Sequence, residues 1–240
     1  MINIFEISKG WETIHDSKIA PAGLSWVAQG SYLKIKQGAI IDETVFLENN
    51  VFIGQRVVLG NRCYIAQGCS IGNLTRIKER TVIKEGVDIG GYVLVGSDVN
   101  IAQNSSIAGG CTISDNALLG KNVQIEPCAF IGNNTILEAG VVIGTATRIG
   151  NNSLIEKETV IGNYTAIGDN ACKAIDIGYA NGYRFCIANI NNVAYIGTNQ
   201  NWFTLKEALA HWSKDDNSPT AMLLLGTAVA IAAHNHWAVG

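Results

Sequence analysis

Aliphatic residues recur at every sixth position through most of this chain. From Ile35 to Ile167, each step of six lands on Ile, Leu or Val without a slip. A helix would return an apolar face every three or four residues, so a period of six excludes a helical heptad pattern. A short period held over so many residues requires one small structural unit stacked many times.

The other positions of the six-residue unit indicate a short strand followed by a corner. Two residues before each aliphatic lies a small or β-branched residue, such as Val51 or Thr75, which suits a second inward-facing position. Cys63, Cys69 and Cys111 fall in this column, so we expect them to fill the core. Three residues after the aliphatic, Asn or Gly is common, and both tolerate the positive φ of a tight corner.

Motifs such as IGNNTI (131–136) and IGNYTA (161–166) resemble those of the hexapeptide-repeat proteins. The resemblance covers residues 33–172 and implies a left-handed parallel β-helix, in which three six-residue units make one triangular coil. It also implies acyl-CoA-dependent acyltransferases that work as trimers, with the active site between neighbouring subunits, although a fold alone does not carry chemistry over. We expect an all-β protein with an N-terminal strand and cap (1–34), the β-helix (35–172), and a C-terminal hairpin with two α-helices (173–240).

The two ends of the chain depart from the period. Residues 183–196 predict a β-hairpin with Asn191 and Asn192 near its turn. Thr204 and Glu207 form a capping box that opens a helix over about 205–213.

A second C-terminal helix and an N-terminal cap complete the predicted elements. The second helix begins at Ser218 and Pro219, runs to about residue 235, and is apolar nearly all round. We expect it to be buried, with its symmetry mates as a candidate cover. Residues 1–34 predict a strand and an irregular cap containing Trp11 and Trp26, which would cover the edge of the first coil.

Three outward-facing stripes follow if each coil holds 18 residues, because positions 18 apart then stack about 4.8 Å from one another. One stripe is polar in its middle, around Asp88 and Ser106, and another is mixed. The remaining stripe is almost wholly apolar, and an exposed apolar stripe of this length needs a partner. We expect a homotrimer that meets through it, the alternative being a cover of terminal segments. Its apolar and aromatic members are Phe46, Tyr64, Val82, Leu118, Ile136 and Leu154.

Several corner positions hold residues other than Gly or Asn. One corner column ends in a predicted ladder of stacked asparagines, Asn116, Asn134, Asn152 and Asn170. Earlier in that column, and on the strand before it, several cationic residues lie close together. An anionic ligand would relieve the repulsion between their charges. The alternative is a solvated basic patch offset by neighbouring carboxylates. A second corner carries Arg56, Leu74 and an aromatic residue that offers a stacking surface. The expected ligand-binding residues are Arg62, Arg76, Lys78, Arg80, Tyr92 and Asp98.

The repeat lacks the histidine that acyl transfer normally uses as a general base. The four histidines, His15, His211, His234 and His236, all lie outside residues 16–210, and we interpret those at helix ends as structural. A metal site of three coil histidines is thereby excluded, and the six cysteines form no C-x-x-C pair. We expect no cofactor, unless a displaced base makes the protein an acyl-CoA-dependent enzyme. The carboxylates that could then substitute are Asp88, Asp98, Asp115 and Glu126.

Charge and hydropathy set the expected environment. The net charge of −3 and a pI near 5.8 give no reason to expect nucleic acid or a membrane surface as partner. The N-terminus shows no secretion signal, and the longest apolar stretch, residues 220–233, is shorter than the roughly 20 residues needed to span a bilayer. We expect a cytoplasmic protein with reduced thiols.

The C-terminal segment YRFCIANINNVAYIGTNQNWFTLKEALAHW resembles the C-termini of small hexapeptide-repeat proteins of bacteriophages and prophages, which implies a viral origin but supplies no activity. The leading hypothesis is a non-catalytic homotrimer that binds or sequesters a small anionic, nucleotide-like ligand, such as a host signalling molecule, in clefts between subunits. The second is an acyltransferase with a displaced base. The third is a protein-interaction or virion component with a host protein as partner.

Overall fold

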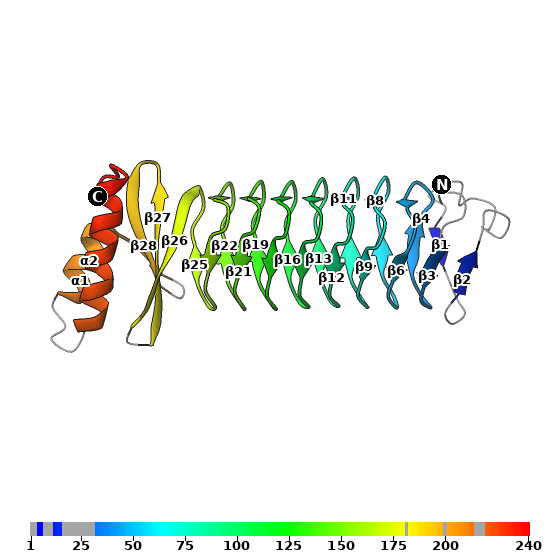
Figure 1. Cartoon of the computed structure of the whole chain (residues 1–240), viewed down its shortest axis with the longest axis horizontal. Helices are drawn as coiled ribbons and strands as arrows, with labels where there is room; N and C mark the ends of the chain where they lie inside the picture. The colour runs from blue at the N-terminus through cyan, green and yellow to red at the C-terminus, as the bar shows by residue number, and fades with distance from the viewer. Residues whose placement is uncertain (1–3, 7–11, 16–31, 181, 199–200, 214–218) are drawn as a thin grey trace.

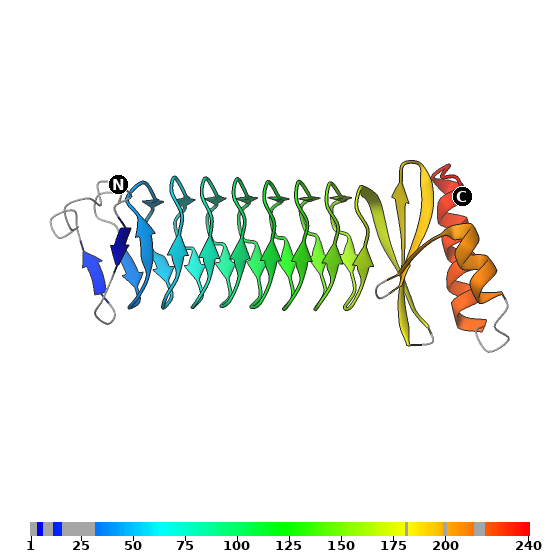
Figure 2. The same cartoon turned by 180° about the vertical axis from the view of Figure 1, so that it is seen from behind.

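The computed structural model describes residues 4–6, 12–15, 32–180, 182–198, 201–213 and 219–240. The expectations for Trp11, Trp26 and Ser218 lie outside these residues. The chain winds into a rod of stacked coils, with the N-terminal strands at one end and two helices at the other (Figures 1 and 2). The predicted β-helix with its C-terminal hairpin and helices is confirmed.

Three sheets form the sides of the rod; each takes one strand from every coil, and these coil strands are parallel. Sheet A contains β1 (Ile4–Glu6), β4 (Ile40–Asp42), β7 (Val58–Leu59), β10 (Arg76–Ile77), β13 (Leu94–Val95), β16 (Thr112–Ile113), β19 (Phe130–Ile131), β22 (Arg148–Ile149) and β25 (Ala166–Ile167). Sheet B contains β2 (Glu12–His15), β3 (Tyr32–Ile35), β6 (Val51–Ile53), β9 (Ser70–Ile71), β12 (Asp88–Ile89), β15 (Ser106–Ile107), β18 (Gln124–Ile125), β21 (Val142–Ile143) and β24 (Val160–Ile161). Sheet C contains β5 (Phe46–Leu47), β8 (Tyr64–Ile65), β11 (Val82–Ile83), β14 (Asn100–Ile101), β17 (Leu118–Leu119), β20 (Ile136–Leu137), β23 (Leu154–Ile155), β26 (Ala171–Ala180), β27 (Tyr183–Ile190), β28 (Val193–Thr198) and β29 (Asn201–Thr204).

The register between coils is the predicted one. Arg76 pairs with Leu94, and Ile77 with Val95, so residues 18 apart are neighbours in a sheet. At the start of the rod, β1 pairs antiparallel with β4 and β2 pairs antiparallel with β3. These two N-terminal strands therefore cover the first edges of sheets A and B.

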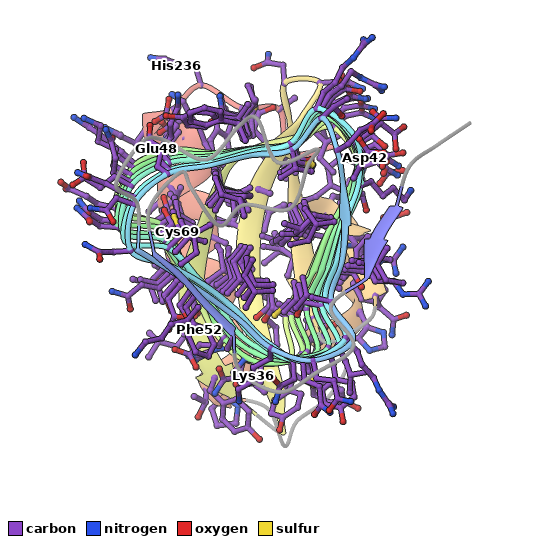
Figure 3. The ribbon with its side chains drawn as sticks, turned by 90° about the vertical axis from the view of Figure 1, so that its right-hand side faces the viewer. Lys36, Asp42, Glu48, Phe52, Cys69 and His236 are labelled. Atoms are coloured by element: carbon purple, nitrogen blue, oxygen red, sulfur yellow. The ribbon has the colours of Figure 1, made fainter. Side chains whose placement is uncertain are left out.

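The interior of the triangle is filled by the two inward columns of the repeat (Figure 3). The large column, including Ile53, Ile65 and Ile83, is fully buried, and the predicted core cysteines, among them Cys69, are buried with it. The small inward column also holds polar residues, which donate hydrogen bonds to the main chain of the next coil. Thr75 Oγ1, for example, lies 2.8 Å from the carbonyl oxygen of Gly90, so this column satisfies its polar atoms without water.

The corners keep one backbone conformation whatever residue occupies them. Asn134 has the left-handed φ expected of an asparagine, at 54°. Arg80 and Tyr92, at 58° and 60°, adopt the same conformation, as do the other corner residues that break the Gly or Asn preference. The stacking of the coils therefore overrides the local preference of the bulky residues.

The predicted asparagine ladder is displaced by one residue. In the predicted column, Asn134 Nδ2 donates to Asn152 Oδ1 at 3.1 Å. The longer ladder uses the residue before it at each corner. Asn133 N–H donates to Asn151 Oδ1 at 2.9 Å, and Asn151 N–H donates to Asp169 Oδ1 at 2.7 Å. The displacement has a reason, since the second corner residue's N–H already bonds a main-chain carbonyl and the first one's does not.

The C-terminal strands continue sheet C and close the end of the rod. The predicted hairpin turn at Asn191 and Asn192 joins β27 to β28. Asp176 on β26 accepts a hydrogen bond from Gly162 N–H at 3.1 Å and forms an ion pair with Arg184 on β27, whose Nε lies 3.1 Å away. A Cβ at Gly162 would overlap the Arg184 side chain, so this glycine lets the hairpin sheet lie on the last coil.

Two helices pack on the outer side of the hairpin sheet, α1 (Leu205–Trp212) and α2 (Pro219–His234). The capping box of Thr204 and Glu207 is confirmed. In the single chain α2 is buried on one face only, because Leu223 on the other face is 71% exposed. Burial of that face by symmetry mates stays a prediction. Among the described residues, no helix is both long and apolar enough to cross a membrane.

Candidate functional site

Sheet A carries the residues expected to bind a ligand, but it spreads them across its width. Arg76 lies on β10, and Lys78 follows that strand. The corner between sheets A and C, the A–C corner, holds Arg62, Arg80 and Asp98. Tyr92 lies at the corner between sheets B and A, the B–A corner. Tyr92 and Arg80 therefore stand at opposite edges of sheet A.

Two of the four cations already have carboxylate partners within the chain. Arg80 binds Asp98 with two hydrogen bonds, Nε to Oδ1 at 2.7 Å and Nη2 to Oδ2 at 2.6 Å. The Lys78 side chain extends across the coil that carries Gly96, and its Nζ lies 3.3 Å from Asp115 Oδ1. Asp98 and Asp115 thus offset part of the repulsion that led us to expect an anionic ligand.

The remaining cations are exposed. Arg62 and Arg76 have no carboxylate partner among the residues that the structure describes, and neither has Arg56. Arg56 lies in the same corner column as Tyr92, two coils earlier. Arg56 was not among the expected ligand-binding residues, because its corner position does not show which cations lack a carboxylate partner.

The B–A corner concentrates bulky residues in a conformation that suits glycine. Arg56, Leu74 and Tyr92 occupy it on three successive coils with φ of 54°, 61° and 60°. A left-handed conformation costs an L-residue about 1–2 kcal/mol. Tyr92 is also 71% exposed, so burial of its ring does not offset that cost in the single chain. From strand geometry, the Cα of Arg76 lies about 8 Å from that of Tyr92.

Sheet C presents the predicted apolar stripe to solvent. Phe46 and Tyr64 stack on each other with ring centroids 5.4 Å apart, and Leu118 and Ile136 are 44% and 38% exposed. A groove of about 500 Å³ runs over Leu118 and Ile136, with Glu138 and Lys157 at its rim. The alternative that terminal segments cover this stripe fails for the C-terminal strands, which extend sheet C beyond the last coil.

A smaller hollow of about 140 Å³ lies on the sheet A side, between Lys78, Leu94, Thr112 and Asp115. It opens where Gly96 leaves no side chain between Lys78 and Ser114. A hollow of this size holds a few water molecules and is too small for a nucleotide. A ligand of that size would have to lie across the surface of sheet A.

Two of the carboxylates considered as general bases are weakened in that role. The bidentate hydrogen bonds from Arg80 lower the pKa of Asp98 below its ordinary value. Ser97 N–H, and then Lys78, lower the pKa of Asp115. Because a general base works best with a pKa near neutrality, neither carboxylate suits acyl transfer.

The other groups considered for chemistry are placed as follows. His211 stacks on Phe203 at a centroid distance of 5.8 Å, which supports the structural interpretation of this helix-end histidine. Across the described ranges, no group of three or more His, Cys, Asp and Glu side chains is placed to hold a metal ion.

Comparisons with known proteins give one family model and several solved structures. The model of the GMPPB C-terminal domain matches residues 28–139. No curated protein matches the chain. The UDP-N-acetylglucosamine acyltransferase LpxA of Bacteroides fragilis is 18% identical, with a TM-score of 0.49 over 53% of this chain, and this chain spans 64% of that protein.

Two further solved structures have similar identity. LpxA of Acinetobacter baumannii is 18% identical with a TM-score of 0.48, over 62% of this chain and 70% of that one. A hexapeptide transferase family protein of Anaplasma phagocytophilum is 14% identical with a TM-score of 0.37, over 85% of this chain and 95% of that one. The activities in these names are those of the named proteins and not of this chain.

Proposed function

We propose that this protein is a homotrimeric β-helix that binds a nucleotide or sugar nucleotide on the outer surface of sheet A, without converting it. Tyr92 carries the proposal. An exposed aromatic ring held at a strained corner, within reach of cations that lack partners, suits a flat base attached to phosphates. The matched family model, which is related to sugar nucleotides, supports the same class of ligand.

Within this proposal, the predicted ligand-binding residues divide into two groups. Arg76 and Arg56 contact the phosphates beside Tyr92, and Arg62 adds charge at the far edge of sheet A. Lys78, Arg80 and Asp98 are committed to ion pairs and shape the surface between them. A bidentate guanidinium suits a phosphate group better than an ammonium does, which favours the arginines as the direct contacts.

The trimer in this proposal forms through sheet C. Its exposed apolar stripe and groove supply the surface that a second copy would bury. The A–C corner borders sheet C, so Arg62 would stand at the edge of the interface, beside the neighbouring subunit. Native mass spectrometry of the intact complex tests the subunit number, and a Leu118→Glu variant is expected to release single chains.

Calorimetric titration with GDP, GDP-mannose and inorganic pyrophosphate tests the ligand. Tyr92→Asn keeps a residue that tolerates the corner, and we expect it to weaken GDP binding about tenfold while leaving pyrophosphate binding unchanged. Arg76→Gln should weaken the binding of both GDP and pyrophosphate.

The repeat supplies matched controls four coils further along. Tyr164 occupies the same corner column as Tyr92, and Arg148 the same outward column as Arg76. The Arg148 guanidinium already lies over the Phe130 ring, 4.4 Å from its centroid, whereas Arg76 has no such partner among the described residues. Tyr164→Asn and Arg148→Gln should therefore leave GDP binding unchanged. Failure of the wild-type protein to bind any of the three probes at millimolar concentration, or equal losses in the control variants, would contradict the proposal.

The same preparation separates the other hypotheses. If the protein releases free CoA from acetyl-CoA in the presence of a sugar nucleotide, the acyltransferase hypothesis is favoured over binding without conversion. The phage or prophage origin and the host-protein partner, which only the C-terminal resemblance implies, stay predictions.

A further inference from the structure

Helix α2 has an outward face that no other part of the described chain covers. Its inner face is buried against the hairpin sheet and α1 through Ala221, Leu225, Ala228 and Ala232. The helix lies at the far end of the rod, beyond the sheet that closes the coils (Figures 1 and 2). Its outward face therefore points away from the coils. The exposed residues of that face are Thr220, Leu223, Gly226, Thr227, Ala230 and Ala233, with Pro219 and His234 at its two ends.

This face lacks the charges that a solvent-facing helix normally carries. Residues 219–233 contain no Asp, Glu, Lys or Arg at all. Leu223 is 71% exposed, and a Cβ added at Gly226 would meet nothing within 4 Å. A surface helix ordinarily places charged residues opposite its buried stripe, so the composition of α2 suits a helix covered on both sides.

The order of residues on this face indicates what covers it. We propose that it packs antiparallel against the same face of a second copy of this chain, about a two-fold axis between Gly226 and Thr227. In that arrangement Leu223 lies opposite the partner's Ala230, and Gly226 lies opposite the partner's Thr227. At each crossing the larger side chain meets a smaller one, so two identical faces fit each other.

Charge and approach distance favour a second copy over other occupants. Identical uncharged faces meet without like-charge repulsion, whereas a helix bound to a membrane surface normally carries Lys and Arg beside its apolar face. Glycine and alanine at the crossing allow two helix axes to approach to about 8 Å. The contact joins rods end to end, so it is separate from sheet C and does not depend on ligand binding.

Sedimentation equilibrium and native mass spectrometry of the full chain test the proposal. Whatever number of chains associates through sheet C, we expect complexes of twice that number at micromolar concentration. Ala230→Glu places two carboxylates at the crossing and should halve the mass, with an unchanged circular dichroism spectrum because Ala230 is exposed. The control Val160→Glu changes an apolar residue of sheet B that is 56% exposed and should leave the doubled mass intact.

A cross-link gives an independent readout. In a Cys128→Ser background, Gly226→Cys should form an interchain disulfide on mild oxidation, and Val160→Cys should not. Wild-type protein that never doubles in mass, or doubling that survives Ala230→Glu, would overturn the proposal. Flotation of the wild-type protein, but not of Ala230→Glu, with phosphatidylcholine vesicles would assign the face to a bilayer and overturn it as well.

Discussion

The A–C and B–A corners share one backbone conformation but use their side chains in different ways. At both corners the first residue bonds the neighbouring coil: Asn151 accepts from the N–H of Asn133 at the A–C corner, and Asn163 accepts from the N–H of Thr145 at the B–A corner. The second residue differs, since the A–C corner uses asparagine there on most of its later coils. At the B–A corner, Leu74, Tyr92 and Tyr164 project outward, and the two tyrosine rings are more than half exposed. Both corners therefore stabilise the stack through their first residue, and the B–A corner also displays bulky side chains at its second residue, at a cost in backbone strain.

The choice of residue at the second corner position therefore separates two groups. Asparagines there favour folding, whereas the bulky residues make folding less favourable than asparagine would. Asparagine at every corner would satisfy the backbone, and the chain uses it at Asn116, Asn134 and Asn152. A tyrosine in the same conformation contributes no such bond, and at Tyr92 the proposed ligand would supply a gain that offsets the strain. The four predictions below test this contrast, from the largest expected effect to the smallest.

The largest contrast concerns the thiols of the B–A corner and the core. Burial raises the pKa of the Cys63 and Cys69 thiols to about 11, whereas Cys128 is exposed at the B–A corner. Because the thiolate is the reactive form, we expect Cys128 to react with an aromatic disulfide reagent at pH 8 at least ~100-fold faster than these two. Cys128→Ser should abolish the fast phase. Equal rates in the native protein would show that the core opens freely.

The ladder residues of the A–C corner should support the fold. Asn151→Ala removes the acceptor for the N–H and Nδ2 of Asn133, so we expect unfolding free energy to fall by about 1–2 kcal/mol in urea denaturation. The Tyr164 side chain, at the B–A corner, makes no hydrogen bond within the described residues, so Tyr164→Ala should change stability by less than about 0.5 kcal/mol. A larger loss for Tyr164 than for Asn151 would reverse the comparison.

Exchanging the corner residues should have opposite effects on the two sides. Tyr92→Asn and Tyr164→Asn relieve left-handed strain, and each should raise the unfolding free energy by about 1 kcal/mol. Asn134→Tyr should lower it by a similar amount. Urea midpoints measured on the three variants check the sign. If both tyrosine variants are stabilised, backbone strain is present at both positions. If only Tyr92→Asn loses GDP binding, Tyr92 alone has a role in binding.

The smallest effect belongs to the ion pair between Arg80 and Asp98, because both side chains are nearly half exposed. The hydrogen bonds from Arg80 hold the folded pKa of Asp98 below its unfolded value. The pair therefore stabilises the protein above the unfolded pKa, near 4, and this stability is lost as pH falls through the folded pKa. Wild-type protein should be slightly more stable than Asp98→Asn at pH 7. A difference that persists unchanged at pH 2 would count against this assignment.

The architecture was predictable because the six-residue repeat directly shows which residues form the core. A period of six fixes which residues face inward, and 18 residues per coil fix which residues stack, as the pairing of Arg76 with Leu94 confirms. The hairpin turn and the capping box followed from local chemistry at Asn191 and Thr204. These features depend on backbone geometry and on neighbours close in sequence, which a single sequence displays.

Side-chain partners were not predictable in the same way. Lys78 reaches Asp115, 37 residues away, only because Gly96 on the intervening coil carries no side chain. The true ladder could have been found, since Asn or Asp recurs at the first corner residue in Asp115, Asn133, Asn151 and Asp169. Finding it requires counting main-chain N–H groups at each corner. The apolar composition of α2 predicted its burial, but composition alone does not show which side of the helix is covered within the chain.

The six-residue unit also determines how this rod can change length during evolution. A full coil holds three units, so deletion of one unit would preserve the inward pattern and the corners. Every later residue would nevertheless rotate by a third of a turn, and side chains that now line sheet C would line another side. Deletion of three units would shorten the rod by about 4.8 Å and leave every surface in place. We therefore expect length variants of this chain to differ by 18 residues, because a smaller multiple of six would keep the core pattern but change which residues share a surface.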